Sequence, residues 1–344
     1  MSASDGIGLR PVDADSPADQ AVAVEIVRQC ELAAIGWTDS TLESVSSQLT
    51  GPRAWREQHR FADVGGQPMG LLAAELNREA REVFLDAYAI GARADDIQRG
   101  LLTVGLAASA DVAAHDAEAL RADDADPFEL SPSIWQALTA AFVPDVGYSA
   151  VIRDLGFRPI RRFWRMSRPL DGVPTDEPPA PTGVTRRLAT GPAAERTLFR
   201  LFEESFAEHF GHQEDETFEG WMARIRSAPG TREDGWWIAE LDGRPVGMCI
   251  VDDSMIELDE GYVRTLGVLP DARGHGIGTW LLRCAAVDAV RRGRTAIALH
   301  VDGANTTGAT ALYESVGYRT SQEFDVYCYP LSDSALSRKA SPQT

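Results

Sequence analysis

The 344-residue sequence has only four cysteines, and they are scattered along the chain. Cys30, Cys249, Cys284 and Cys328 form no C-x-x-C pair, and most have apolar neighbours, where a free cysteine behaves as a small hydrophobic residue. A disulfide framework or a zinc site would need closely spaced cysteines. The sequence therefore predicts neither a disulfide framework nor a metal site.

Long hydrophobic runs are also lacking. The longest mildly apolar stretch, Leu101 to Ala114, is broken by Ser109 and Asp111 and is too short to span a bilayer. The first residues, MSASDGIGLRPVDADSP, contain acids and no cationic region followed by an apolar one, unlike a signal peptide. We expect a soluble, cytoplasmic protein with no membrane partner.

Positive charge is scarce, since 33 Lys and Arg residues face 52 Asp and Glu residues, for a net charge of −19. DNA or RNA would be repelled, which argues against a nucleic-acid partner. The charge is uneven, however: residues 272–300 contain five arginines and one acid, Asp288. This basic cluster adjoins a glycine-rich loop, and the combination favours an anion site.

A proline-rich segment divides the chain. Residues 171–183, DGVPTDEPPAPTG, hold four prolines and few apolar side chains, which predicts a stiff linker. On either side, LGFRPIRRFWRMSRPL aligns without gaps with VGYRTSQEFDVYCYPL, and Gly156 matches Gly317 at an offset of 161 residues. FADVGGQPMG similarly resembles IAELDGRPVG. The repeat predicts domains at 1–170 and 183–331, a linker over 171–182 and a flexible tail over 332–344.

The second half reads as antiparallel hairpins followed by strand–helix–strand–helix, which predicts a mixed-sheet α/β (α+β) fold. The expected elements are a helix with a phenylalanine stripe at helical spacing, a hairpin at Asp242-Gly243, and then a strand over 262–268, a helix over 278–292, a strand over 295–301 and a short helix ending at Gly317.

Three glycines, Gly274, Gly276 and Gly278, stand between the expected strand and helix. Uncovered N–H groups at a helix N-terminus bind phosphate, and glycine lets the backbone approach the oxygens closely. A tight turn alone would need one glycine. The P-loop pattern is missing, and the dinucleotide fingerprint would need glycine at Thr279. The spacing is instead R-x-x-G-x-G, starting at Arg273.

The segment LGVLPDARGHGIGTWLL resembles the acyl-CoA-binding segment of the GNAT superfamily of N-acetyltransferases. The whole chain resembles the tandem GNAT proteins, of which mycothiol synthase is one. The resemblance implies two tandem GNAT-like domains, with acetyl-CoA as co-substrate and no metal. In the family, the loop binds the CoA pyrophosphate and the preceding strand splays to pair with the pantetheine arm. The implied CoA-binding residues are Leu266, Gly267, Val268, Arg273, Gly274, His275, Gly276, Ile277, Gly278 and Thr279.

A later stretch, NTTGATALYESVGYR, resembles the second CoA segment of the family. The resemblance places Asn305 near the pantetheine and Tyr313 near the thioester sulfur, as the catalytic acid. Tyr313 is anchored by the pattern A-x-x-L-Y-x-x-x-G-Y. The family usually spaces the Asn and Tyr by seven residues and here the gap is eight, so Asn305 departs from the pattern.

The general base has several candidates. Glu260 lies just upstream of the strand expected to splay, where the family often places a carboxylate, while Tyr262 is closest to the usual register. His209 and His212 follow the phenylalanine stripe, in the region that forms the acceptor wall of GNAT folds.

The first half departs from the family pattern. After VFLDAYAI comes GARADDIQRG, with no R-x-x-G-x-G, and the offset of 161 puts Ile152 where Tyr313 stands. We expect this domain to be degenerate. The second domain is then an acetyl-CoA-dependent N-acetyltransferase that acts on a primary amine of a small molecule, as a monomer or homodimer. The alternative is a sensor or scaffold that binds acyl-CoA without turning it over.

Overall fold

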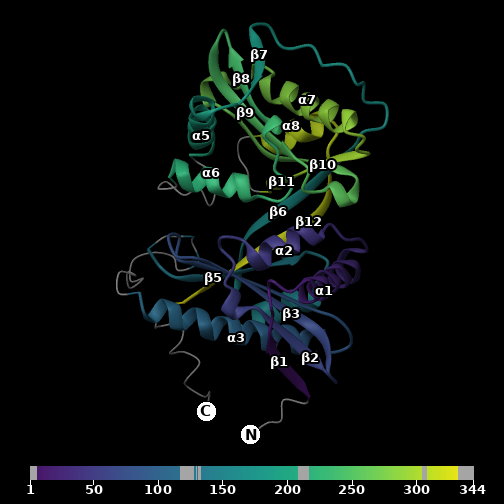
Figure 1. Cartoon of the computed structure of the whole chain (residues 1–344), viewed down its shortest axis with the longest axis vertical. Coiled ribbons are helices and arrows are strands. Elements are labelled where there is room, and N and C mark those ends of the chain that lie inside the picture. Colours follow the sequence, from purple (N-terminus) through teal and green to yellow (C-terminus); the bar gives the residue numbers. More distant parts are fainter. Residues whose placement is uncertain are drawn as a thin grey trace. The chain divides into compact units, whose positions relative to one another are not determined.

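The computed structural model describes residues 6–116, 128, 130, 133–207, 217–303 and 308–331. The chain forms two compact units. Unit 1 comprises Met1–Arg162 and Phe324–Thr344, and unit 2 comprises Phe163–Glu323. Figure 1 shows the elements of both units in the order of the sequence.

The two halves of the chain repeat one order of elements. The first half contains β1 (Ile7–Pro11), α1 (Pro17–Ile35), α2 (Leu42–Thr50), β2 (Arg60–Val64), β3 (Gln67–Asn77), β4 (Glu82–Ala89), α3 (Ala94–Ala114), β5 (Gln136–Phe142), α4 (Val146–Asp154) and β6 (Arg158–Pro169). The second half contains β7 (Val184–Leu188), α5 (Pro192–Phe206), α6 (Phe218–Ser227), β8 (Trp236–Leu241), β9 (Arg244–Asp252), β10 (Glu260–Val268), α7 (Ile277–Arg291), β11 (Ala296–Asp302), α8 (Ala309–Ser315) and β12 (Arg319–Pro330). The same order found twice confirms the predicted tandem repeat of a mixed α/β fold.

The strand order is β1-β2-β3-β4-β5-β12 in unit 1 and β7-β8-β9-β10-β11-β6 in unit 2. Neighbouring strands are antiparallel except for the parallel pairs β4–β5 and β10–β11. The segments related by the 161-residue offset, β6 and β12, therefore take equivalent antiparallel places. Each does so in the sheet of the other half, because β12 pairs with β5 and β6 pairs with β11.

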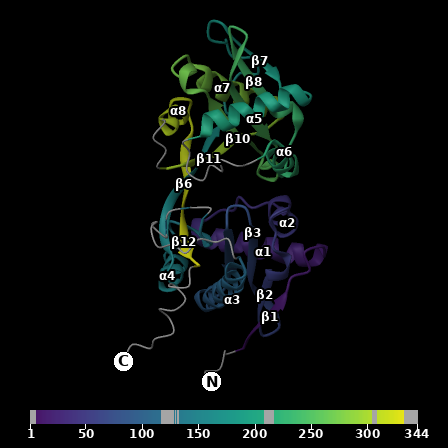
Figure 2. The same ribbon diagram turned by 90° about the vertical axis from the view of Figure 1, so that its left-hand side faces the viewer.

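This strand exchange differs from the expected division into 1–170 and 183–331, which kept each terminal strand with its own half. Figure 2 shows β6 and β12 as two long strands side by side. Residues 324–330 of β12 complete the sheet of unit 1, and residues 163–169 of β6 complete the sheet of unit 2. A sequence repeat establishes that two strands are equivalent. It does not determine which sheet each strand joins, because both sheets have the same kind of open edge.

The proline-rich segment is fixed along α7 within unit 2. The indole N–H of Trp280 donates to the carbonyl of Pro178 at 3.0 Å. The Nε of Arg291 donates to the carbonyl of Thr175 at 2.8 Å. Two ends of one helix thus hold an otherwise extended segment by its carbonyl groups, which proline leaves available as acceptors.

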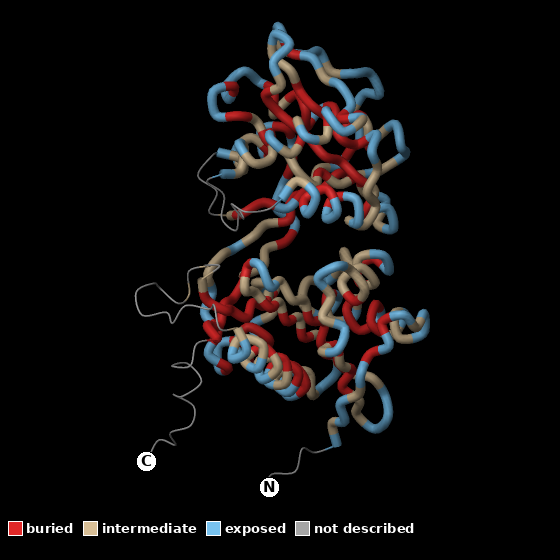
Figure 3. The backbone as a smooth tube through the Cα atoms, turned by 60° about the vertical axis from the view of Figure 1, so that its left-hand side comes forward, coloured by how far each residue is buried: buried red, intermediate tan, exposed pale blue. Residues whose placement is uncertain are grey.

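Helices cover both faces of each sheet. In unit 2, α5 and α6 pack on one face, with Trp221 fully buried between them and the sheet, and α7 and α8 pack on the other. Unit 1 repeats the arrangement with α1 and α2 on one face and α3 and α4 on the other. Figure 3 shows the buried residues gathered along the strands and the inner sides of the helices. The phenylalanine stripe belongs to α5, where Phe199 and Phe202 lie 5.6 Å and 5.4 Å from the Trp221 ring.

Candidate functional site

A cavity of about 560 Å³ lies in unit 2 where β10 and β11 separate. The parallel register of these strands runs from Glu260 and Ala296 to Tyr262 and Ala298 and ends there. Beyond that point β10 stays paired with β9 as far as Val268, with a register shift between Val263 and Thr265. The side of β10 that faces away from β9 therefore offers backbone groups to the cavity rather than to β11.

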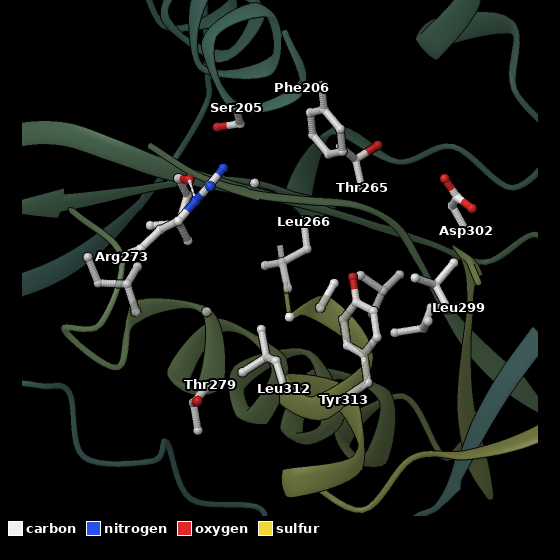
Figure 4. A pocket seen from close by; sticks show the side chains of 18 of the residues that line it. Ser205, Phe206, Thr265, Leu266, Arg273, Thr279, Leu299, Asp302, Leu312 and Tyr313 are labelled. Atoms are coloured by element: carbon white, nitrogen blue, oxygen red, sulfur yellow. Dashed lines mark hydrogen bonds between the residues drawn. The ribbon is translucent and has the colours of Figure 1, made fainter. Parts of the chain in front are cut away.

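The cavity is lined from both faces of the sheet. In Figure 4, Ser205 and Phe206 of α5 lie on one side of β10, and Leu312 and Tyr313 of α8 lie on the other. The opening between the strands therefore joins the two faces. Such a passage lets two molecules approach one reaction centre from opposite sides of a sheet.

The glycine loop forms one end of this cavity. Gly274 and Gly276 have φ values of +82° and +76°, which other residues rarely adopt. Gly276 is the N-cap of α7 and supplies no side chain to the first turn, so the N–H groups at this helix end are left uncovered. A Cβ on Gly278 would lie 3.1 Å from the Leu312 side chain, so this glycine lets α8 pack closely. Residues 266–268, 273, 274 and 276–279 all line the cavity.

Tyr313 lies at the opposite end of the cavity, on α8. Its side chain is 9% exposed, and its hydroxyl points toward β10 (Figure 4). Burial, followed by the nearby Cys249 and Tyr262, raises the pKa of Tyr313 well above the usual value of a tyrosine. The phenol is therefore protonated at neutral pH, the form that can donate a hydrogen bond or a proton.

Glu260 does not line the cavity. Its carboxylate forms an ion pair with Arg165 of β6, whose side chain is almost fully buried and which also donates to the hydroxyl of Ser321 at 3.1 Å. This ion pair holds the carboxylate against β6 and away from the cavity. The expected catalytic role for Glu260 is therefore at odds with its position.

Of the expected histidines and Asn305, only His275 is described, and it does not line the cavity. His275 is in the loop, with its Nδ1 3.2 Å from the carbonyl oxygens of Ala272 and Arg273. His209 and Asn305 lie outside the described residues, as does His212.

Several cavity residues have no counterpart among the residues singled out from the sequence. The most informative is His300 of β11, whose Nδ1 lies 2.8 Å from the hydroxyl of Tyr262 on β10. Asp302, at the end of β11, is 5% exposed and lines the same cavity. The alternation of large and small residues in TAIALHV placed His300 and Ala298 on one face of a strand, but that pattern reveals neither the partner strand nor its register.

Unit 1 keeps the strand separation but fills it. The parallel register of β4 and β5 also spans only three pairs, from Glu82 with Gln136 to Phe84 with Leu138. Tyr148 of α4 is buried here, its hydroxyl accepting from the backbone N–H of Ala87 and lying 3.1 Å from the Thr139 hydroxyl. The 161-residue offset places the small Ala309, which lines the unit 2 cavity, where Tyr148 stands. A side chain thus occupies in unit 1 the space that is open in unit 2.

Two features are absent from the part of the chain that the structure describes. None of its helices has both the length and the apolar character required to cross a membrane. Its His, Cys, Asp and Glu side chains form no group of three or more that could hold a metal ion.

Comparison with known protein families matches residues 196–318 to the acetyltransferase (GNAT) family. The chain is 34% identical over 163 residues to a mycothiol acetyltransferase of Thermomonospora curvata, covering 47% of this chain and 53% of that protein. It is 33% identical over 181 residues to a mycothiol acetyltransferase of Salinispora tropica, covering 49% and 55%. The chain thus spans about half the length of the curated relatives it matches.

Comparison with solved structures covers nearly the whole chain. A GCN5-related N-acetyltransferase from Sphaerobacter thermophilus superposes with a TM-score of 0.77 at 22% identity, over 95% of this chain and 96% of that one. A tandem GNAT protein from the clavulanic acid biosynthesis pathway superposes with a TM-score of 0.69 at 14% identity, over 95% and 99%. The family match lies on the unit that holds the glycine loop and the open cavity, and the two-fold repeat is that of tandem GNAT structures. Residues 196–318 of unit 2 therefore match the acetyltransferase (GNAT) family, and the whole chain has the fold of tandem GNAT structures.

Proposed function

We propose that unit 2 transfers an acetyl group from acetyl-CoA to the primary amine of a small molecule. The observation that carries the proposal is the convergence on one cavity of three features: the uncovered N-terminus of α7, the unpaired edge of β10 and the buried hydroxyl of Tyr313. Each matches one part of an acyl-CoA, namely the pyrophosphate, the amide-containing arm and the thioester.

The cavity residues fit such a ligand. Gly274 and Gly276 add no Cβ where the pyrophosphate would meet the helix N-terminus, and the positive end of the α7 dipole favours its charge. The edge of β10 from Thr265 to Val268 offers backbone groups that pair with an extended amide arm as a neighbouring strand would. Arg273, which directly precedes Gly274 and lines the cavity, adds a positive charge.

Tyr313 is assigned the role of the acid. Acyl transfer releases a thiolate, which needs a proton, and a protonated phenol in a buried site can supply it. The peptide N–H groups of β10 next to the register shift can donate to the oxygen on which negative charge develops.

Unit 1 is assigned no acyl-CoA. Tyr148 fills the separation between β4 and β5, and its hydroxyl already takes the N–H of Ala87 that an extended ligand would need. The turn between β4 and α3 also lacks the R-x-x-G-x-G sequence. This unit therefore contributes through packing and through the strand that it exchanges with unit 2.

The alternative is a protein that binds acyl-CoA without transferring the acyl group. Both hypotheses predict binding of one acetyl-CoA per chain, so binding alone does not separate them. Turnover does, and the presence of a protonated tyrosine in the cavity favours the enzyme, because binding would not require it.

The test has two stages with the full chain. Calorimetry should show one acetyl-CoA bound per chain, and no binding would overturn the proposed function in both forms. Release of free CoA is then measured against a panel of small primary amines that includes the acceptor of mycothiol acetyltransferases, because the relatives described above carry that name. Binding with no CoA release for any amine would favour the sensor or scaffold.

A further inference from the structure

Three polar side chains gather on one face of the unit 2 sheet beside the cavity. In the parallel pair of β10 and β11, Tyr262 and Ala298 share a face, and His300 lies two residues further along β11 on that same face. Arg165 of β6 is the register partner of His300, so its side chain lies there too. Alternate residues of these strands, such as Ile297 and Leu299, pack instead with α7.

This face is opposite to the one covered by α7 and α8, which carries Tyr313. Because the cavity is lined from both faces, His300 and Tyr313 approach it from opposite sides of the sheet. A thioester whose sulfur lies at Tyr313 would therefore present its carbonyl carbon to a nucleophile arriving on the His300 side. The face that holds His300 is the side from which the acceptor would enter.

The contact with Tyr262 orients the His300 ring. The phenol oxygen of Tyr262 and the Nδ1 of His300 are 2.8 Å apart, a normal hydrogen-bond length. In the neutral ring with its proton on Nδ1, that nitrogen donates to the phenol oxygen and Nε2 has the lone pair. The ring is then a neutral imidazole whose second nitrogen can accept a proton, and its orientation is fixed by a neighbouring strand.

Charged groups around the ring keep it neutral. Arg165 of β6 and Arg264 of β10 lie close by, while Glu260 is paired with Arg165. Desolvation and the two guanidinium groups lower the pKa of His300, and the exposure of the residue limits the contribution of desolvation. Asp302, two residues further along β11, is the remaining acid that lines the cavity.

We propose that His300, held by Tyr262, is the base that accepts the proton of the acceptor amine in the acyl transfer. The inference rests on the proposed function of unit 2 and replaces Glu260 in that role. The amine nitrogen bonds to the carbonyl carbon and the C–S bond breaks. His300 takes the proton that the nitrogen loses at Nε2, while Tyr313 gives one to the departing sulfur. Both side chains return to their starting states by exchanging one proton with water, so no further reactant is needed.

A weakly basic imidazole suits this role because the amine loses its proton only after its nitrogen has bonded to the carbonyl carbon. An alkylammonium ion holds its proton with a pKa of roughly 10, beyond the reach of such a base. A nitrogen that has just bonded to a carbonyl carbon is far more acidic. The nearby guanidinium groups also disfavour an ammonium ion at this face and favour the neutral amine.

The first test needs no acceptor. Long-range ¹H–¹⁵N spectra of the full chain, labelled at its six histidines, report the tautomer of each ring. His300, identified with His300→Asn, is expected to carry its proton on Nδ1 and to remain neutral at pH 6. Tyr262→Phe is expected to shift the equilibrium between the form protonated on Nδ1 and the form protonated on Nε2. A spectrum with the proton on Nε2, or a charged ring at pH 6, would overturn the proposal whatever the activity.

The second test uses the amine that gives the fastest CoA release in the panel. His300→Asn is expected to lower kcat about 10²-fold or more at pH 7, with acetyl-CoA affinity unchanged in calorimetry. Tyr262→Phe is expected to lower it less, and His115→Asn, at an exposed histidine of unit 1, is expected to leave it unchanged.

The outcomes separate this inference from the function on which it rests. If the parent binds no acetyl-CoA, the proposed function fails. If the parent transfers acetyl and His300→Asn keeps its kcat within about three-fold, the role of His300 is wrong and the function stands. A folded variant that binds acetyl-CoA normally but turns over slowly, with a pH profile that has lost its acidic limb, supports the proposal.

Discussion

The hydroxyl of Tyr148 accepts the backbone N–H of Ala87 at 3.3 Å, across the gap where β4 and β5 separate. In unit 2 the equivalent gap is open and is lined by Ala309. The large side chain of Tyr148 thus fills in unit 1 the gap between strands that is open in unit 2.

Tyr148→Ala is expected to destabilise the chain without creating a second ligand site. Truncating a buried aromatic residue costs about 3–5 kcal/mol of unfolding free energy, as for other large-to-small core changes. Tyr148→Phe should cost about 1–3 kcal/mol, because it strips the N–H of Ala87 of a partner. Denaturant unfolding measures both. Calorimetry should still give one acetyl-CoA per chain. A second site in Tyr148→Ala would show that the Tyr148 side chain alone prevents unit 1 from binding acetyl-CoA.

Gly276→Ala should weaken acetyl-CoA binding about 10-fold or more, because a Cβ at φ +76° distorts the loop where the pyrophosphate approaches. Gly293→Ala is the matched control. That glycine follows α7 at its other end with φ +78° and open space around it, so the strain is similar but the cavity is distant. Equal losses of affinity in calorimetry would contradict the loop assignment.

Tyr313→Phe should lower kcat by roughly 10²–10⁴ while the affinity for acetyl-CoA stays nearly constant, because only proton donation to the sulfur is lost. Tyr318→Phe is the control. Its ring centre lies 6.1 Å from that of Tyr313, and its buried hydroxyl has no hydrogen-bond partner among the described residues. Similar kcat values for the two variants would point to a packing role for Tyr313.

His59 predicts a pH dependence of stability in unit 1. Its Nδ1 accepts from the N–H of Ala74 at 3.1 Å, and its Nε2 lies 3.1 Å from the carbonyl of Leu49, which fixes the neutral ring. Burial lowers its pKa from 6.5 to about 4. Between these values the unfolded chain binds a proton that the folded chain does not, so stability falls as pH drops from 6.5 toward 4, by about 3 kcal/mol in all.

Urea unfolding at pH 7 and pH 5 measures this effect, and His59→Gln isolates it. Asp86, whose pKa burial raises to about 7, works in the opposite direction and is present in both proteins. The parent should lose about 2 kcal/mol more than the variant between the two pH values. Identical losses would exclude His59 as the source.

The glycine loop and the tandem fold could be predicted because their signals are local or repetitive. Gly274 and Gly276 are needed by the backbone conformation and Gly278 by the close packing of α8. The match of Gly156 with Gly317 shows that one order of elements occurs twice. Such patterns can be recognised in the sequence without knowing which distant segments contact each other in the fold.

The base could not be predicted because it depends on contacts between distant segments. Glu260 forms an ion pair with Arg165, 95 residues earlier in the chain, and the sequence does not show this contact. His300 becomes notable only when the register of β10 and β11 brings Tyr262 to its ring. The strand exchange is hidden for the same reason, since it concerns which of two similar edges a strand chooses.

The exchange of β12 has a consequence for how the protein is made. During synthesis, β5 is complete once residue 142 has been added, whereas the residues that pair with it begin at Phe324. At roughly 5–20 residues per second, the gap corresponds to about 10–40 s in which the edge of β5 has no partner strand. A nascent chain with an open edge is prone to pair with its neighbours on the same message. Slow translation of the second half should therefore lower the yield of folded protein, and a holdase chaperone should restore it.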